Sequence, residues 1–167
     1  MTLVPHRTLL LVLATLLLTA CSGWQLRGQT HTPQFESVTL AGGTARLRYT
    51  LERELTPLGV LLHNESPYVI RVIDERWDRR TAAVDERGRI AELELHYELV
   101  WQLIDRDTQA PLNPPRHIRA LRNLAYYPDN ITASSDEEEM IRQDLYDDIV
   151  YRLINQLADA SRKVQQD

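Results

Sequence analysis

The chain has 167 residues, with 24 acidic and 19 basic side chains, a formal net charge of −5 and one cysteine. This length favours a single domain, and the acidic balance argues against a polybasic protein, so no nucleic-acid partner is expected. A single cysteine excludes an intramolecular disulfide and a thiolate metal cluster. No cofactor or metal site is predicted.

The first residues are typical of a targeting segment. A short polar and basic start precedes an apolar run over residues 8–18. The run is shorter than the ~20 residues that a helix needs to cross the hydrocarbon layer, but it fits a secretory signal peptide. It ends in Leu18-Thr19-Ala20-Cys21, which is similar to a bacterial lipobox. We expect removal of residues 1–20 and lipid attachment, including palmitate, at Cys21; an ordinary signal peptide and a short membrane anchor are the alternatives.

The lipobox also predicts a location. Several acyl chains anchor a protein stably where one chain would not. Ser22, rather than Asp, would be the second residue of the processed chain, and this favours the periplasmic side of the outer membrane, with the lipid in its inner leaflet. We predict an extended lead-in over residues 21–36, a single α/β domain over 37–163 and a tail over 164–167.

The first half of the expected domain contains strand, helix and strand. Residues 37–41 are β-prone, and leucines at helical spacing then predict an amphipathic helix that ends near Pro57, with Gly59 as a left-handed cap; these leucines are Leu47, Leu51, Leu55 and Leu58. A strand is expected over residues 68–80. Residues 81–88 are predicted to form a turn with Gly88 at positive φ.

The second half begins with the strongest strand signal. Apolar residues occupy every second position within residues 92–103, which predicts one buried and one wet face. Another strand is expected over residues 116–127. Ser135 and Glu138 form a capping-box pattern, and apolar residues every four positions then predict a long helix to about Ala160.

The order of these elements is β-α-β-β-β-α. An α+β, two-layer sandwich suits this order, with two helices packed on one face of a small, four-stranded, mostly antiparallel sheet.

No residue pattern predicts catalysis, so the chain is not expected to be an enzyme. The histidines are scattered, and neither a zinc-protease motif nor a nucleophile elbow is present. His96 is expected on the wet strand face as a solvated or hydrogen-bonded side chain. Glu92, Glu94 and Glu98 share that face, where a calcium or acid-base site is conceivable, although a role in solubility is the preferred interpretation.

Arginine dominates the basic residues, since Lys163 is the only lysine. Guanidinium groups bind phosphate and carboxylate through paired hydrogen bonds, so arginines on a turn could hold an anionic lipid head group or pair with nearby carboxylates. Arg87 and Arg89, next to the expected hairpin turn, are the preferred candidates because loop residues are free to meet a ligand. The arginines gather at 76, 79 and 80, at 87 and 89, and at 116, 119 and 122.

Four short motifs, in this order, resemble the LPS-assembly lipoprotein family LptE, also called RlpB. They are the opening Cys21-Ser22-Gly23-Trp24-Gln25-Leu26-Arg27-Gly28, then Leu58-Gly59-Val60, the segment Arg87-Gly88-Arg89-Ile90-Ala91-Glu92, and the start of the last helix at Asp136-Glu137-Glu138-Glu139-Met140-Ile141.

The resemblance implies a role as plug and assembly partner inside the outer-membrane barrel LptD, with lipopolysaccharide bound during its delivery to the outer leaflet. The chain has one extra residue, Ser22, in the opening motif. It carries Ser134-Ser135 where some relatives have a basic residue, so Arg87 and Arg89 are the candidate lipopolysaccharide-binding residues. The alternative is a stand-alone periplasmic lipid-handling or transport-accessory lipoprotein, which would need an apolar cavity for acyl chains.

Overall fold

The computed structural model describes residues 32–164, and it contains one mixed sheet. Its strand order is β2 (Leu61–Leu62), β1 (Ser37–Ala41), β3 (Tyr68–Val84), β4 (Ile90–Asp105) and β5 (Arg116–Ala125). β1 runs parallel to both of its neighbours, whereas β3, β4 and β5 are antiparallel. The prediction of four strands was therefore one strand short. The missing β2 has only two residues, too few to show a period of its own.

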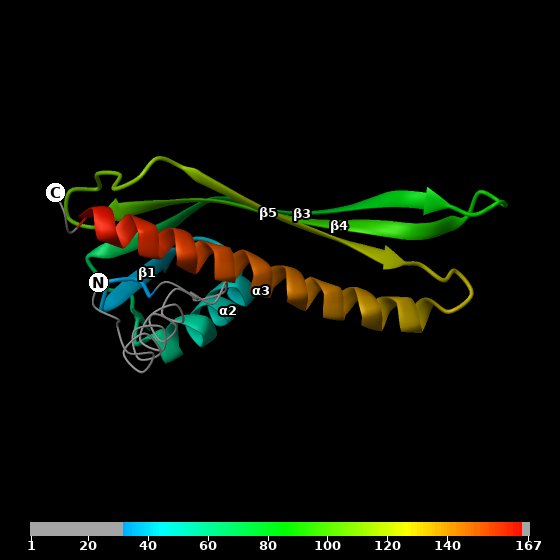
Figure 1. The fold of residues 1–167 in the computed structure, drawn as a ribbon, viewed down its shortest axis with the longest axis horizontal. Coiled ribbons are helices and arrows are strands. Elements are labelled where there is room, and N and C mark those ends of the chain that lie inside the picture. The colour runs from blue at the N-terminus through cyan, green and yellow to red at the C-terminus, as the bar shows by residue number, and fades with distance from the viewer. Residues whose placement is uncertain (1–31, 165–167) are drawn as a thin grey trace, which may run out of the picture.

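Two helices cover one face of this sheet (Figure 1). They are α2 (Ala45–Leu55), which continues as the 3₁₀ turn η2 (Thr56–Leu58), and α3 (Ile131–Val164). The predicted α+β two-layer fold is confirmed. The N–H of Leu47 donates to Oγ1 of Thr44 at 3.2 Å, which caps α2. Gly59 has the predicted positive φ, 75°.

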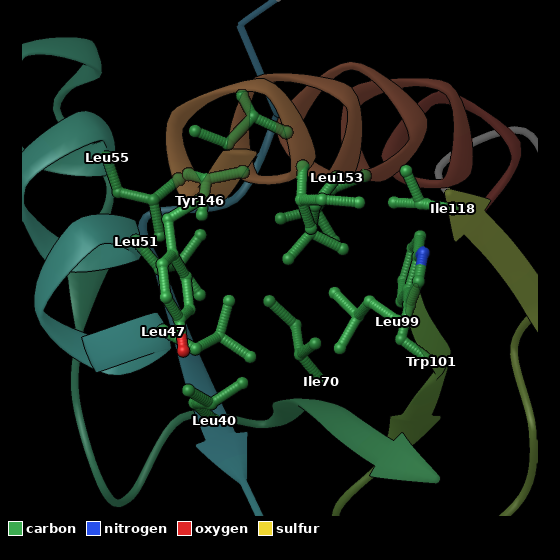
Figure 2. Close-up of a cluster of buried hydrophobic side chains, with 14 of the residues drawn as sticks. Leu40, Leu47, Leu51, Leu55, Ile70, Leu99, Trp101, Ile118, Tyr146 and Leu153 are labelled. Carbon is green, nitrogen blue, oxygen red and sulfur yellow. The ribbon is translucent and has the colours of Figure 1, made fainter. Parts of the chain in front are cut away.

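The core lies between the sheet and the two helices (Figure 2). The three α2 leucines predicted at helical spacing, Leu47, Leu51 and Leu55, are fully buried. The alternating residues of β4 face them, and the largest of these, Trp101, is also fully buried. Its indole N–H donates to Oε1 of Gln156 in α3 at 3.1 Å, so its one polar group is satisfied.

The molecule has a broad end and a narrow end (Figure 1). We call the broad end the body (residues 32–75, 99–118 and 143–164); here β1, β2 and α2 join the long strands and the later part of α3. We call the narrow end the arm (residues 76–98 and 119–142); here only β3, β4, β5 and the start of α3 continue. The β3–β4 hairpin tip lies at the end of the molecule opposite β1.

A β-bulge lies just before the start of the arm. The pairing of β3 with β4 shifts between Val72 and Asp74, which leaves Ile73 as the extra residue, 50% exposed. The bulge reverses the alternation of the strand. Val72 and Glu75 consequently both face the helices.

Two predicted boundaries were wrong. β3 continues to Val84, although a turn was expected from residue 81; its last residues pair with β4 through two register shifts, which hide the alternation in the sequence. α3 starts at Ile131, so Ser135 lies within the helix and is not its cap. The loop before α3 closes earlier than predicted, with the N–H of Asn130 donating to the carbonyl of Tyr127 at 3.0 Å.

Candidate functional site

The predicted signal peptide, Cys21 and the first of the four resemblance motifs lie outside the described residues. Lipid attachment at Cys21 thus stays a prediction. Between residues 32 and 164, no helix combines the length and apolar character needed to cross a bilayer.

The tip of the arm is the hairpin turn between β3 and β4. Its carboxylate Asp85 accepts hydrogen bonds from the backbone N–H groups of Arg87 and Arg89, both at 2.9 Å. The bond from the Arg89 N–H is the main cause that lowers the pKa of Asp85 below its ordinary value. Gly88 has the predicted positive φ, 74°. The turn is thus built around one carboxylate.

The two candidate arginines of the tip differ in their contacts. The Nε of Arg89 lies 2.8 Å from Oδ2 of Asp85, and its Nη1 lies 3.4 Å from Oδ1 of Asp129 in the loop before α3. Arg89 therefore joins two loops of the tip. The side chain of Arg87 is exposed and forms no ion pair with any residue in the described range 32–164. Of the two, Arg87 is the one whose guanidinium is free to meet a ligand.

The sheet divides the arginine clusters seen in the sequence between its two faces. Successive residues of a strand point to opposite faces, so Arg79 turns towards α3, 3.4 Å from Glu138, whereas Arg76 and Arg80 lie on the outer face. We use "outer face" for the side of the sheet turned away from α2 and α3. The same alternation on β5 puts Arg119 on the outer face.

A hydrogen-bonded group, which we call the hub, joins the arm to the body. The carboxylate of Glu75 accepts from the N–H and Oγ1 of Thr44 at 2.7 and 2.8 Å, and from the hydroxyl of Tyr97 at 2.8 Å. The indole N–H of Trp77 donates to the hydroxyl of Tyr146 at 3.2 Å. Burial raises the pKa of Tyr97 well above its ordinary value. The hub connects α2, β3, β4 and α3.

The three glutamates on the wet face of β4 already have partners. Glu94 contacts the ring of His96, Glu98 pairs with Arg119, and Glu92 accepts from the side-chain amide of Asn123 at 2.8 Å. His96 is on the wet face and hydrogen-bonded, as predicted. Across residues 32–164, no three His, Cys, Asp or Glu side chains are grouped to hold a metal ion.

A comparison with protein-family models decides the family. The model described as "LptE: Lipopolysaccharide-assembly" matches residues 30–157, well over half of the chain. The chain belongs to the LptE family. A search of curated protein sequences found no significant match.

Solved structures of bacterial lipoproteins share this LptE fold. Lipoprotein B from Nitrosomonas europaea is 28% identical, with a TM-score of 0.69, and the match covers 86% of this chain and 96% of that one. Rare lipoprotein B from Shewanella oneidensis is 20% identical, with a TM-score of 0.65 and coverage of 77% and 98%. A minor lipoprotein from Acinetobacter baumannii is 22% identical, with a TM-score of 0.64 and coverage of 76% and 93%.

Sequence reasoning missed the gathering of arginines on the outer face. Arg76 and Arg119 are both paired with Glu98 in the sheet register, although they come from strands that are not neighbours in it. The only signal available was the alternation of β4, which places Glu98 on the wet face. No residue pattern indicates the register of β3 and β5 against β4.

Proposed function

We propose that this LptE-family protein works at the outer membrane, anchored through Cys21, as the plug and assembly partner of an LptD-like β-barrel, and that it binds lipopolysaccharide. The role is non-enzymatic. The observation that carries the proposal, beyond family membership, is the arm, a narrow extension with a charged outer face. A barrel lumen is lined by polar side chains, so an arm of this kind suits insertion there.

The alternative, a lipid shuttle working alone, fits the structure less well. It would need an apolar cavity for acyl chains, but the space between sheet and helices is occupied by buried side chains such as Leu51, Trp101 and Leu153 (Figure 2). Two hollows on the arm have charged side chains in their lining, five arginines in one and Asp85, Arg89 and Asp129 in the other. An acyl chain in either hollow would remove these charges from water, which is costly.

Co-purification from outer membranes tests the proposal. The full-length tagged protein is expected to bring down an LptD-like barrel, whereas Cys21→Ala should reduce its recovery in the membrane fraction. Failure to recover any barrel with the lipidated protein would contradict the proposal. The double variant Arg87→Glu/Arg89→Glu is expected to keep the barrel and to bind lipopolysaccharide more weakly; unchanged binding would remove the tip from the proposed lipid contact.

A further inference from the structure

The outer face of the arm carries a row of cations that none of the comparisons assigns to a ligand. Trp77 and Tyr97 face α3, where both rings lie against Tyr146. Their neighbours along the strands must then point outwards. In the register of the sheet, Arg76 of β3 and Arg119 of β5 stand on either side of Glu98.

The next positions along the strands complete the arrangement. Asp78, His96 and Leu121 form the second row, and Arg80 stands in the third. These rows border a hollow of about 690 Å³. Its volume lies in the range of sites that take drug-sized ligands, and a lone inorganic ion would occupy little of it.

The hollow is rich in arginine, although it carries little net charge. Its lining contains five arginines, the three of the outer face together with Arg122 and Arg152 at the β5 edge, and two carboxylates. Three further carboxylates lie beside this lining: Asp74 pairs with Arg76, Asp148 pairs with Arg122 and Arg152, and Glu94 contacts His96. An anion would therefore be held by the N–H donors of the guanidinium groups and not by a net positive charge.

The three outer-face arginines are exposed enough to bind a further group. The side chains of Arg76, Arg80 and Arg119 are 65%, 63% and 75% exposed, and each pairs with one carboxylate at the surface. Exposed pairs of this kind stabilise a protein by only about 0–1 kcal/mol. Each guanidinium has five N–H donors and binds phosphate in paired fashion, so donors are left for a ligand.

From these contacts we propose that the outer-face hollow is a binding site, separate from Arg87 and Arg89 at the tip, for a phosphorylated saccharide head group, that of lipopolysaccharide. Arg76 and Arg119 hold phosphate oxygens from two sides, and Arg80 binds a further anionic group of the same ligand. Leu121, 52% exposed between them, offers an apolar contact to the sugar rings. The inference rests on the proposed function and adds to it the residues and the chemistry that select the ligand.

Binding measurements with the full-length protein test the site. The triple variant Arg76→Gln/Arg80→Gln/Arg119→Gln is compared with Arg53→Gln/Arg71→Gln/Arg162→Gln. The control removes the same charge from positions outside the hollow, two of them exposed and one, Arg162, half-buried. We expect the first variant to bind purified lipopolysaccharide about tenfold or more weakly and the second to bind it like the unchanged protein. Equal losses in both variants would overturn the proposal, because general charge attraction would then account for binding.

Two further probes distinguish the source of the anion. Enzymatically dephosphorylated lipopolysaccharide should bind weakly to the unchanged protein, and no more tightly than it binds to the triple arginine variant. Inorganic pyrophosphate should compete only poorly; if it binds as tightly as lipopolysaccharide, the site is one for free phosphate and the assignment to a glycolipid is wrong. Co-purification of the barrel with the Arg76→Gln/Arg80→Gln/Arg119→Gln variant separates this inference from the proposed function. If the variant keeps the barrel and still binds lipopolysaccharide like the unchanged protein, the hollow is not a binding site, whereas the proposed function stands.

Discussion

The body and the arm share strands and one helix, and both bury apolar side chains, but they differ in the charged contacts between sheet and helix. In the body, α2 and α3 cover the sheet with aliphatic side chains, and Leu47, Leu51 and Leu55 are fully buried. In the arm, contacts between sheet and helix include charge: Arg142 lies 5.2 Å from the Trp77 ring centroid and Arg79 lies 3.4 Å from Glu138.

This difference separates stability from function. Burial of apolar area is not screened by salt as charge interactions are, and it is the dominant favourable term in folding. Exposed ion pairs contribute little to stability and are screened by salt, but they leave arginine donors at the surface. The body therefore supports the fold, and the arm carries charged groups towards a partner. Substitutions of buried residues in the body should therefore lower stability, and substitutions on the outer face of the arm should have little effect on it.

The largest effect is expected in the body, from Leu51→Ala. Leu51 is fully buried, and removal of such a side chain costs about 2–5 kcal/mol through lost burial and the cavity left behind. Leu121→Ala on the arm, where the leucine is 52% exposed, should change stability by less than about 0.5 kcal/mol. Urea unfolding checks both variants. Equal losses would break the comparison between body and arm.

The hub between the two regions should show an intermediate effect, from Tyr97→Phe. This change removes the hydroxyl that donates to Glu75 at 2.8 Å while the ring stays stacked on Trp77. A hydrogen bond to a charged group contributes about 1.5–3 kcal/mol, so a loss of that size is expected on urea unfolding. Tyr151→Phe, on an exposed tyrosine of α3, is the matched control and should stay close to the unchanged protein.

The same variant tests how the free energy of unfolding depends on pH. Burial raises the pKa of Tyr97 in the folded state above its ordinary value of 10.0. The unfolded chain therefore loses this proton first, so the stability linked to Tyr97 is complete below about pH 10 and falls as the pH rises further. Tyr97→Phe lacks this loss, and its stability should approach that of the unchanged protein above pH 10. Parallel stability curves for the two proteins would contradict a buried, neutral Tyr97.

The helices and strands could be predicted from the sequence wherever a single element shows its own residue pattern. The alternation of β4 showed its buried face directly, because its two faces meet different surroundings. The leucine spacing and Gly59 similarly revealed α2 and its end. The start of α3 was missed because Ile131, Thr132 and Ala133 contain no capping pattern, while the box at Ser135 mimics one.

The outer-face site could not be predicted, for a different reason. It depends on the register of three strands and on the bulge at Ile73, which changes the face of the β3 residues from Asp74 to Thr81. An alternation continued from Ile70 would have placed Arg76 and Arg80 beneath α3 and Glu75 outside. A single inserted residue thus decides which arginines meet solvent, and no local pattern in the sequence marks it.

The smallest expected effect is at the arm tip, where Arg89→Gln should loosen the hairpin without changing global stability. Arg89 joins Asp85 to Asp129 and so links the hairpin turn to the loop before α3. Its loss should speed amide hydrogen exchange at residues 85–89 and leave exchange in the body unchanged, because ion pairs at the end of the arm do not contact the core of the body. Arg87→Gln, which breaks no ion pair, is the control and should leave exchange at the tip as it is.

Faster exchange in both variants would mean that the turn depends on its total charge. Faster exchange in neither variant would mean that the hydrogen bonds of Asp85 within the turn are enough to hold the tip. The expected difference between two arginines two residues apart would show that even within the arm one arginine supports the structure while its neighbour is left for a partner.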